Sequence, residues 1–532
     1  MEKKKTKIII ASSLAIVLLS ASITRIVFSK QSYMGGIQNV TFFSQSPSYR
    51  DKGFNELTHD GVNDYAINSK EMVGNTSTAA YSDNGATYVN ELSNIYDLGA
   101  DTIVSSGFNV AGAYSSVYDK KIPGSFDGLY SKKYNGKYED KSIVIIDDNS
   151  LANINENAIS INFKTQDAGF IAGVAASLYT VYAFENYDLN PSIAVWGGLP
   201  YSTVFDWLSG LEQAVNWFNY QVLGFKLDGT EVDPLNKATW EELKDDDTHT
   251  KSLEYETNFE GNDHKKMNHG ITINNAGSID SIDYSKAPPK GSNDGVNFDP
   301  ITSFYTGGFG FDPNDQASGS NAMNKIKKIK SDSGQDAIVF PVAGGQTMET
   351  LANLPNGSNT MAIGVDSDAE AASPNYGENI LGSATKNIEM AASFGTWYSQ
   401  NKDASVEEQE AYVSGGKTAE EFIKGWAPES TEGVVGTQFT GNFQNGGVGF
   451  EDNGSNKVGA LLDYFIPKED GSWTTEDFLS EIKDVFDMND NTIESSSETF
   501  AIQDGGLWVP LHLTSGMSEE FPWIPDWETY HN

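Results

Sequence analysis

The chain has 532 residues, of which 38% are hydrophobic and 12% aromatic, so it is long enough for two or three domains with real cores. Its formal net charge of -39 disfavours nucleic acid and anionic substrates as partners, because the long-range field repels phosphate groups. The sequence contains no cysteine, which excludes disulfides, thiolate metal sites and cysteine nucleophiles.

The first 30 residues are typical of an export signal. A lysine-rich start precedes an apolar run from Ile8 to Thr24, so the positive end would stay in the cytoplasm. Ser20 to Ser22 is a candidate cleavage site, whereas Arg25 followed by apolar residues favours an uncleaved membrane anchor, and the sequence leaves both open. In either case we expect the chain after about Ser29 to lie outside the cell.

Three strand patterns, each followed by a helix or a polar turn, lie between residues 38 and 150. These apolar strand patterns span 39–43, 100–104 and 142–146. Strands that alternate with helices predict an α/β fold with a doubly wound sheet. We therefore predict a first lobe over residues 38–150, which the chain rejoins at about 383–425.

A second lobe is predicted over residues 151–382, joined to the first by a hinge. Its strand patterns are 192–196, Asp336 to Val342, Met361 to Val365 and Leu381 to Thr385. Residues 226–299 are dominated by Asp, Asn, Lys and Gly, so we interpret them as a solvated insertion with at most one small hairpin. Residues 426–532 are predicted to belong partly to lobe 2 or to cross between lobes, with an unassigned tail.

The predicted strands of the second lobe end on groups that suit ligand binding. One leads into Gly344, the next into Asp366 and Asp368, and the last ends at Lys386. Because the carboxyl ends of parallel strands meet at one edge of a sheet, we expect these groups to converge on one small molecule. Gly344 permits close approach of the backbone to that ligand.

Asp366 and Asp368 allow three interpretations. Catalysis is the weakest, because no nucleophile or metal partner lies nearby in the sequence, and so we predict neither an enzyme nor a cofactor. Capping of the following helix is the structural alternative. Binding of sugar hydroxyls fits best, since an ionised carboxylate accepts two hydrogen bonds from vicinal hydroxyls.

Three aromatic residues, Phe54, Phe108 and Trp207, follow polar or glycine-containing turns at the predicted strand ends. Core packing is the alternative role for each of them. An aromatic ring exposed at such a turn favours stacking against a planar ligand.

A weak metal candidate lies near the C-terminus. Asp487, Asn489, Asn491 and Glu498 match positions 1, 3, 5 and 12 of a calcium-binding loop. Thr492 replaces the glycine that makes the sharp turn, and this favours a simple polar loop.

A set of short motifs runs in a fixed order from about residue 38 to about residue 395. They are Asp51-Lys-Gly-Phe54-Asn55, Gly107-Phe108, Ile145-Ile-Asp147, Asn162 to Phe170, Gly197-Gly198, Trp207-Leu-Ser-Gly210, Asp336 to Gly345, Gly364 to Asp368 and Thr385-Lys386. The ordered set resembles the basic membrane protein family of extracellular substrate-binding proteins for ABC transporters, which has the type I periplasmic-binding fold and includes purine nucleoside receptors.

This resemblance implies roles for individual residues. Phe54 and Trp207 would sandwich a nucleobase, although the family usually has phenylalanine at the second position, and Asn55 would hydrogen-bond the edge of the base. Asp366 would hold ribose hydroxyls, and Asp368 is a second candidate carboxylate. The backbone of Gly344 would line the pocket, and Lys386 would close the polar network.

The function that the resemblance implies is capture of a nucleoside, in particular a purine nucleoside, and delivery to a membrane permease. The alternative is a surface adhesin or antigen that keeps the fold without a transport ligand. Many relatives are tethered through an N-terminal cysteine, so here the apolar N-terminal segment would anchor the protein at the cell surface. The arginine-poor composition, with only Arg25 and Arg50, is what a mollicute surface protein would show.

Overall fold

The computed structural model describes residues 40–44, 49–68, 77–78, 85–115, 128–198, 202–223, 270–274, 306, 336–354, 357–428, 431, 433–465, 467–468 and 471–487. The predicted signal or anchor, most of the predicted insertion 226–299 and the C-terminal tail lie outside these residues. So do Asn489, Asn491 and Glu498 of the calcium-loop candidate, together with the side chain of Asp487.

The first lobe contains a parallel six-stranded sheet in the order β13-β5-β4-β3-β1-β2. Its strands are β1 (Val40–Ser44), β2 (Ser77–Thr78), β3 (Thr102–Ser106), β4 (Ser142–Ile146), β5 (Ala158–Phe163) and β13 (Thr437–Gly441). The described side chains of β1, β3 and β4 are almost all buried, as expected for parallel strands covered on both faces.

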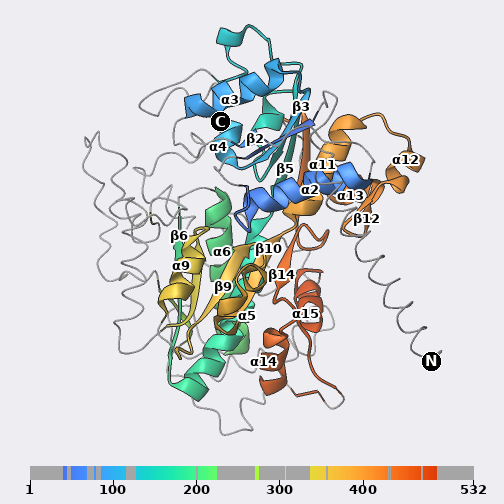
Figure 1. Cartoon of the computed structure of the whole chain (residues 1–532). Coiled ribbons are helices and arrows are strands. Elements are labelled where there is room, and N and C mark those ends of the chain that lie inside the picture. Colours follow the sequence, from blue (N-terminus) through green and yellow to red (C-terminus); the bar gives the residue numbers. More distant parts are fainter. Residues whose placement is uncertain are drawn as a thin grey trace, which may run out of the picture.

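The second lobe repeats this design, with the order β14-β10-β9-β8-β6-β7. Its strands are β6 (Asn190–Gly197), β7 (Thr272–Asn274), β8 (Asp336–Val342), β9 (Met361–Asp366), β10 (Ile380–Lys386) and β14 (Val448–Glu451). All neighbours are parallel except β14, which is antiparallel to β10. Figure 1 shows the two lobes one above the other. The predicted α/β class with two doubly wound lobes is confirmed.

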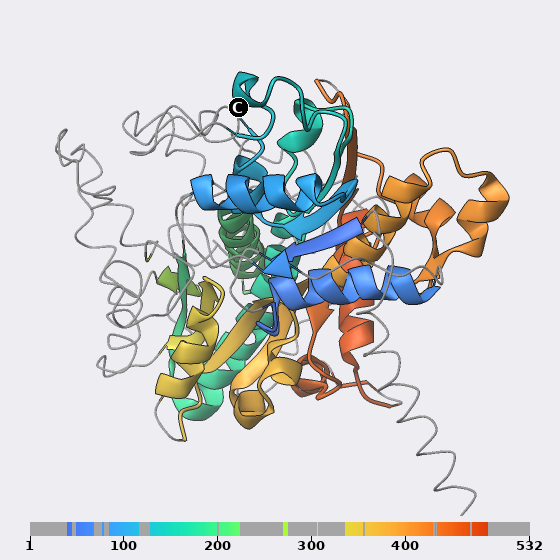
Figure 2. The ribbon, with the colours of Figure 1, turned by 45° about the horizontal axis from the view of Figure 1, so that its top comes forward.

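Helices cover both faces of each sheet, and the same two lobes are seen in a second view (Figure 2). Those of the first lobe are α2 (Phe54–Asn68), α3 (Gly85–Asp97), α4 (Phe108–Gly112) and α11 (Ile388–Gln400). Those of the second are α5 (Thr165–Tyr187), α6 (Ser202–Trp217), α9 (Gln346–Asn353), α10 (Ala369–Ala372), α14 (Lys457–Phe465) and α15 (Thr475–Asp487). A small hairpin of β11 (Val413–Ser414) and β12 (Lys417–Thr418) lies between α12 (Val406–Ala411) and α13 (Ala419–Gly425).

Three predicted boundaries need correction. The predicted return to the first lobe at 383 falls inside β10, which pairs with β9 and β14 of the second sheet, so lobe 2 extends to Lys386. Strand β5 pairs with β4, so the first sheet extends to Phe163 and lobe 2 begins with α5, beyond the predicted boundary at 150. The connection between β4 and β5 contains no full helix. The prediction relied on strands that alternate with helices, and so it ended the first lobe before β5. Strand β7 lies inside the predicted insertion and completes the second sheet, because residues 271–273 supply a short β-branched run.

Three segments cross between the lobes and are tied together by backbone hydrogen bonds. They are the β5 to α5 link at Lys164, the β10 to α11 link at Asn387, and residues 442–447 between β13 and β14. Lys164 N–H donates to the Gly441 carbonyl at 2.7 Å, and Asn387 N–H donates to the Gly447 carbonyl at 2.8 Å. Lys386 therefore lies directly beside a hinge segment.

Helix α5 forms the centre of the second lobe. Among the described residues it is the one helix long and apolar enough to cross a membrane, and 89% of its apolar window is buried inside the protein. It packs against α6 with almost no space between the backbones. A Cβ atom added at Gly169 would lie 2.2 Å from the Trp207 carbonyl oxygen, and one at Gly210 would lie 2.0 Å from the Gln166 carbonyl oxygen.

This close crossing gives a stability prediction. Gly210→Ala is expected to lower the free energy of unfolding by about 2 to 3 kcal/mol, because the new methyl group forces two helix backbones apart. Gly425→Ala is the matched control, since nothing lies within 4 Å of a Cβ atom there. Urea unfolding of both variants checks this, and equal stabilities would contradict the close packing.

Candidate functional site

The carboxyl ends of strands from both sheets meet at one buried amine. The Lys386 ammonium lies 2.9 Å from Asp147 Oδ2, at the end of β4, and 3.0 Å from Asp366 Oδ1, at the end of β9. It also donates to Thr203 Oγ1 on α6 at 3.4 Å. The Lys386 side chain is only 2% exposed and that of Asp147 only 6%. One lysine thus bridges a carboxylate of each lobe.

The charges of this cluster do not balance, because two carboxylates face one ammonium. Burial raises the pKa of Asp147 to about 6, although the nearby Lys386 acts in the opposite direction, and the Asp366 charge raises it further. Burial alone would lower the pKa of Lys386, but the two aspartates outweigh it and raise that pKa. The surplus carboxylate oxygens favour a ligand that brings hydrogen-bond donors and no negative charge.

The two aspartates share an uncommon backbone conformation. Asp147 has a φ of 65° and Asp366 a φ of 67°, in the left-handed region that costs about 1 to 3 kcal/mol for a residue other than glycine. Aspartate tolerates this region better than most residues. The two carboxylates follow equivalent strands, because β4 and β9 occupy the same place in the strand orders of their sheets. Strained backbone of this kind clusters at functional sites.

Aromatic rings from both lobes surround the same amine. The Lys386 Nζ atom lies 5.3 Å from the ring centre of Phe54 on α2, 5.8 Å from that of Trp207 on α6, and 6.0 Å from that of Phe163. The structure therefore brings the predicted residues Phe54, Trp207 and Lys386 together. Trp207 is only 1% exposed and packs edge to face on Phe340, so core packing accounts for much of its surface.

Asn55 lies at the start of α2 in a network that orders this corner of the first lobe. Its Nδ2 group donates to Asp51 Oδ2 at 2.7 Å, and its Oδ1 atom accepts from Ser44 Oγ at 3.1 Å. The Asp51 carboxylate also accepts from the backbone N–H groups of Gly53 and Glu56. This cap explains why α2 begins directly after the predicted turn.

Two other predicted residues lie at strand ends. Gly344 follows β8 with a φ of 52°, which suits glycine, and it is exposed where the chain turns into α9. Phe108 is the first residue of α4, but its side chain is outside the described part of the structure. Their predicted ligand contacts remain predictions.

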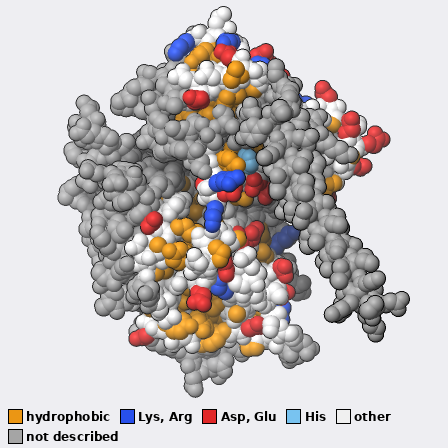
Figure 3. All heavy atoms as spheres, viewed as in Figure 1, with side chains coloured by type: hydrophobic (Ala, Val, Ile, Leu, Met, Phe, Trp, Pro, Cys, Tyr) orange, Lys and Arg blue, Asp and Glu red, His pale blue; other side chains and the backbone are white. Residues whose placement is uncertain are grey.

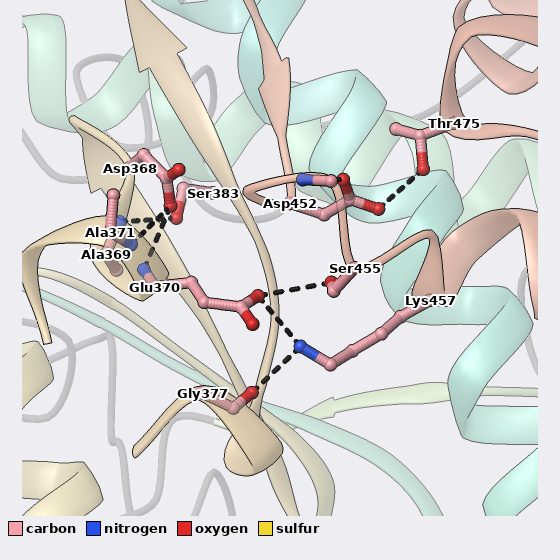
Figure 4. Close-up of polar contacts among 11 residues, drawn as sticks. Asp368, Ala369, Glu370, Ala371, Gly377, Ser383, Asp452, Ser455, Lys457 and Thr475 are labelled. Atoms are coloured by element: carbon pink, nitrogen blue, oxygen red, sulfur yellow. Dashed lines mark hydrogen bonds and ion pairs between the residues drawn. The ribbon is translucent and has the colours of Figure 1, made fainter. Parts of the chain in front are cut away.

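Asp368 serves as a helix cap. Its Oδ1 atom accepts from the backbone N–H groups of Glu370 and Ala371 at 2.9 and 3.1 Å (Figure 4). This is the capping role that the sequence offered as the alternative to ligand binding. Glu370 in turn pairs with Lys457 at 2.8 Å and accepts from Ser455, so the short helix α10 is fastened to the segment that follows β14. This network holds the chain that follows Asp366 in place.

Acidic and basic side chains gather over the middle of the face seen in Figure 3, where the lobes meet. No group of three or more histidine, aspartate or glutamate residues in the described part of the chain is placed to hold a metal ion.

Sequence reasoning missed Asp147, Phe163 and Thr203 as members of the site. Asp147 carries a recognisable signal, because Ile145-Ile146-Asp147 repeats the pattern of a buried strand that ends on aspartate, as Val365-Asp366 does. Phe163 and Thr203 carry none, since their positions depend on how the lobes meet.

The raised pKa of Asp147 gives a pH-dependent prediction. The folded protein binds this proton more tightly than the unfolded chain, so the stability from this group is present at low pH and lost as pH rises from about 4 through about 6. Asp147→Asn imitates the protonated form, and its stability relative to wild type should rise by about 1 to 2 kcal/mol between about pH 5 and about pH 7.5. Urea unfolding at both pH values checks this, and a pH-independent difference would contradict it.

Comparison with known proteins agrees with the motifs. Residues 37–211 match the family model described as ABC transporter substrate-binding protein PnrA-like. An uncharacterized lipoprotein of Mycoplasma pneumoniae (strain ATCC 29342 / M129 / Subtype 1) is 23% identical over 253 residues, which cover 43% of this chain. The alignment spans only 37% of that relative's length.

Solved structures of solute-binding proteins are distant from this chain. One from an ABC transporter system of Aeropyrum pernix K1 has 14% identity and a TM-score of 0.44, covering 84% of this chain and 85% of its own. An ABC transporter solute-binding protein from Clostridium phytofermentans with bound β-D-glucose has 11% identity and a TM-score of 0.41, covering 81% and 98%. The family-model match confirms the resemblance predicted from the motifs, and over residues 37–211 this chain is similar to the PnrA-like substrate-binding proteins of ABC transporters.

Proposed function

We propose that the chain binds a neutral nucleoside between its two lobes and delivers it to an ABC permease in the membrane. The observation that carries this proposal is the Lys386 ammonium bridging Asp147 and Asp366 amid aromatic rings of both lobes. A nucleoside supplies a flat base for the rings and hydroxyl donors for the surplus carboxylate oxygens. An anionic ligand would add negative charge to a cluster that already has an excess.

The positions of the side chains suggest which part of the nucleoside each one would contact. Phe54 and Trp207 come from different lobes, so a base held near both would tie the lobes together. Asp366 would orient the ribose, with Lys386 neutralising its charge, and Asn55 would lie on the base side with Phe54. Gly344 would contribute backbone contact. This assignment keeps the roles that the family resemblance implies.

Delivery requires that ligand binding change the relation between the lobes. Contacts at the interlobe boundary already exist: Ser367 Oγ donates to the Lys52 carbonyl at 3.1 Å, and the Lys52 ammonium donates to the Ala372 carbonyl at 2.5 Å. A permease would recognise the surface that forms when the two lobes close and make such contacts. The lipoprotein relative and the family match support a place on the outer side of the plasma membrane, with the N-terminal segment as signal or anchor.

A thermal-shift screen tests the proposal. The folded protein is mixed with purine and pyrimidine nucleosides, the free bases, D-ribose and D-glucose, and its unfolding temperature is measured. We expect nucleosides to raise the unfolding temperature more than free bases or sugars, because a nucleoside engages both the rings and the carboxylates. Purine nucleosides should raise it most, because their larger base offers more area for stacking. A shift with glucose alone would make the ligand a sugar, and no shift with any compound would favour an adhesin or antigen with the same fold.

A further inference from the structure

The hairpin of β11 and β12 is fastened to the first lobe. Tyr412, directly before β11, is 6% exposed and stacks on Trp397 of α11 with ring centres 5.6 Å apart. Ser414 Oγ of β11 and Ser393 Oγ of α11 both donate to Asp64 Oδ2 of α2. Because α2 and α11 belong to the first lobe, the hairpin belongs to it as well.

The turn of the hairpin lies beside the hinge. Gly415 and Gly416 have φ angles of 55° and 78°, as the two residues of a type I′ turn require. A Cβ atom added at Gly415 would lie 3.3 Å from Met390 Sδ, in the first turn of α11, and α11 begins directly after the hinge link at Asn387. The turn therefore presents the next residue, Lys417, to the hinge.

Lys417 reaches from the hairpin to the third crossing segment, residues 442–447. Its ammonium donates to the carbonyl of Asn445, and a Cβ atom added at Gly446 would lie 3.1 Å from the Nζ atom. The side chain is half-buried at this contact. It therefore holds the peptide group that joins Asn445 to Gly446.

Asn445 also orders the segment through its own side chain. Its Oδ1 atom accepts from the backbone N–H groups of Asn442 and Gly447 at 2.7 and 3.0 Å. Its Nδ2 group donates to the carbonyls of Thr440 and Gly425 at 2.8 and 2.9 Å, which ties the turn to β13 and to the end of α13. The hydrogen bond from the hairpin thus acts on a turn that is already held to the first lobe.

A positive charge of the second lobe lies near the Lys417 ammonium. Burial lowers the pKa of Lys417, Glu421 acts in the opposite direction, and Lys483 on α15 lowers it further. Glu421 accepts from the Thr418 N–H at 2.7 Å in the capping box of α13. The repulsion between the two lysines favours moving α15 away from the hairpin, and the bond to the hinge segment opposes that movement.

We propose that Lys417 is a latch on the hinge, whose hydrogen bond to the Asn445 carbonyl stabilises the arrangement of the lobes seen here and breaks when they open. Backbone torsions in the crossing segments have to absorb any opening. Rotation of the peptide group before Gly446 would turn the carbonyl away from the ammonium. The inference concerns the free protein, so it does not depend on which ligand binds.

Distances between spin labels on the two lobes test the latch in the full-length protein without ligand. The chain has no cysteine, so Glu91→Cys on α3 and Ala352→Cys on α9, both at exposed positions, give two labelling sites. In this background Lys417→Met should shift the ratio of compact to open molecules roughly fivefold toward the open form, the effect of losing one hydrogen bond. Lys417→Arg keeps a donor for the carbonyl and should retain the wild-type distances.

Amide hydrogen exchange of residues 442–447 is the second readout, because it detects open molecules that are too rare for the distance measurement. Lys417→Met should raise the exchange rate there roughly fivefold and leave that of β4 unchanged. Lys424→Met is the matched control, since it removes a lysine from the exposed surface of α13, and it should change neither readout.

Three results would overturn the proposal. Wild-type distances and exchange rates in Lys417→Met would show that the hinge does not depend on this lysine. A lower unfolding temperature with both readouts unchanged would assign the lysine to the stability of the hairpin alone. Equal changes in Lys424→Met would show a general effect of charge.

Discussion

Lys386→Met is expected to lower the free energy of unfolding at neutral pH by about 3 to 5 kcal/mol, the usual cost of removing one partner from a buried ion pair. Without the ammonium, Asp147 and Asp366 lose the charge that both of them contact. Methionine keeps most of the side-chain volume near the aromatic rings, so the loss should come from the charge. Urea unfolding monitored by circular dichroism measures it.

Two variants locate the origin of that loss. Lys424→Met removes a lysine that pairs with Glu420 on the surface of α13, and an exposed pair of this kind should leave stability almost unchanged. The double variant Lys386→Met with Asp147→Asn should recover a large part of the stability, because one of the two opposed carboxylates is gone. No recovery would show that the lysine contributes by packing instead of charge.

Asp366→Ala is expected to weaken the binding of purine ribonucleosides by about 2 to 3 kcal/mol and that of free bases much less. The reason is that a carboxylate positioned for ribose hydroxyls makes no bond to a base alone. Titration of wild type and variant with a purine ribonucleoside, its 2′,3′-dideoxy analogue and the free base gives the comparison. Equal losses of affinity for the free base and the ribonucleoside would show that Asp366 does not bind the ribose.

Asp368→Ala serves as a control on the same loop. Asp368 caps α10, so its loss should cost about 1 kcal/mol of stability. If capping is its whole role, nucleoside affinity stays unchanged, and a selective loss of ribonucleoside binding would restore the predicted ligand role.

The strand ends were predictable because their signal is local. An apolar run that stops at a charged residue indicates a buried parallel strand whose end faces solvent or ligand, and this pattern found Asp366 and Lys386. The same pattern ends at Asp147, yet its importance emerges only when the second lobe places Lys386 beside it. A charge pair between lobes has no signature in either segment alone.

The burial of Trp207 and the strand β7 could not be predicted from the sequence, because both depend on tertiary contacts. Trp207 follows a turn at a strand end, as an exposed stacking residue would, but it is 1% exposed and its ring packs edge to face on Phe340. Strand β7 is too short to stand out from the polar residues around it, and its identity as a strand comes from pairing with β6.

In the proposed function, one neutral nucleoside is held by the cluster of Asp147, Lys386 and Asp366 between the lobes. Isothermal titration of the wild-type protein with a purine nucleoside and with the corresponding 5′-monophosphate tests this binding. The nucleoside should bind with one-to-one stoichiometry and the nucleotide far more weakly, because its phosphate meets an excess of carboxylate charge. Absence of nucleoside binding, or tighter binding of the nucleotide, would contradict the proposed function.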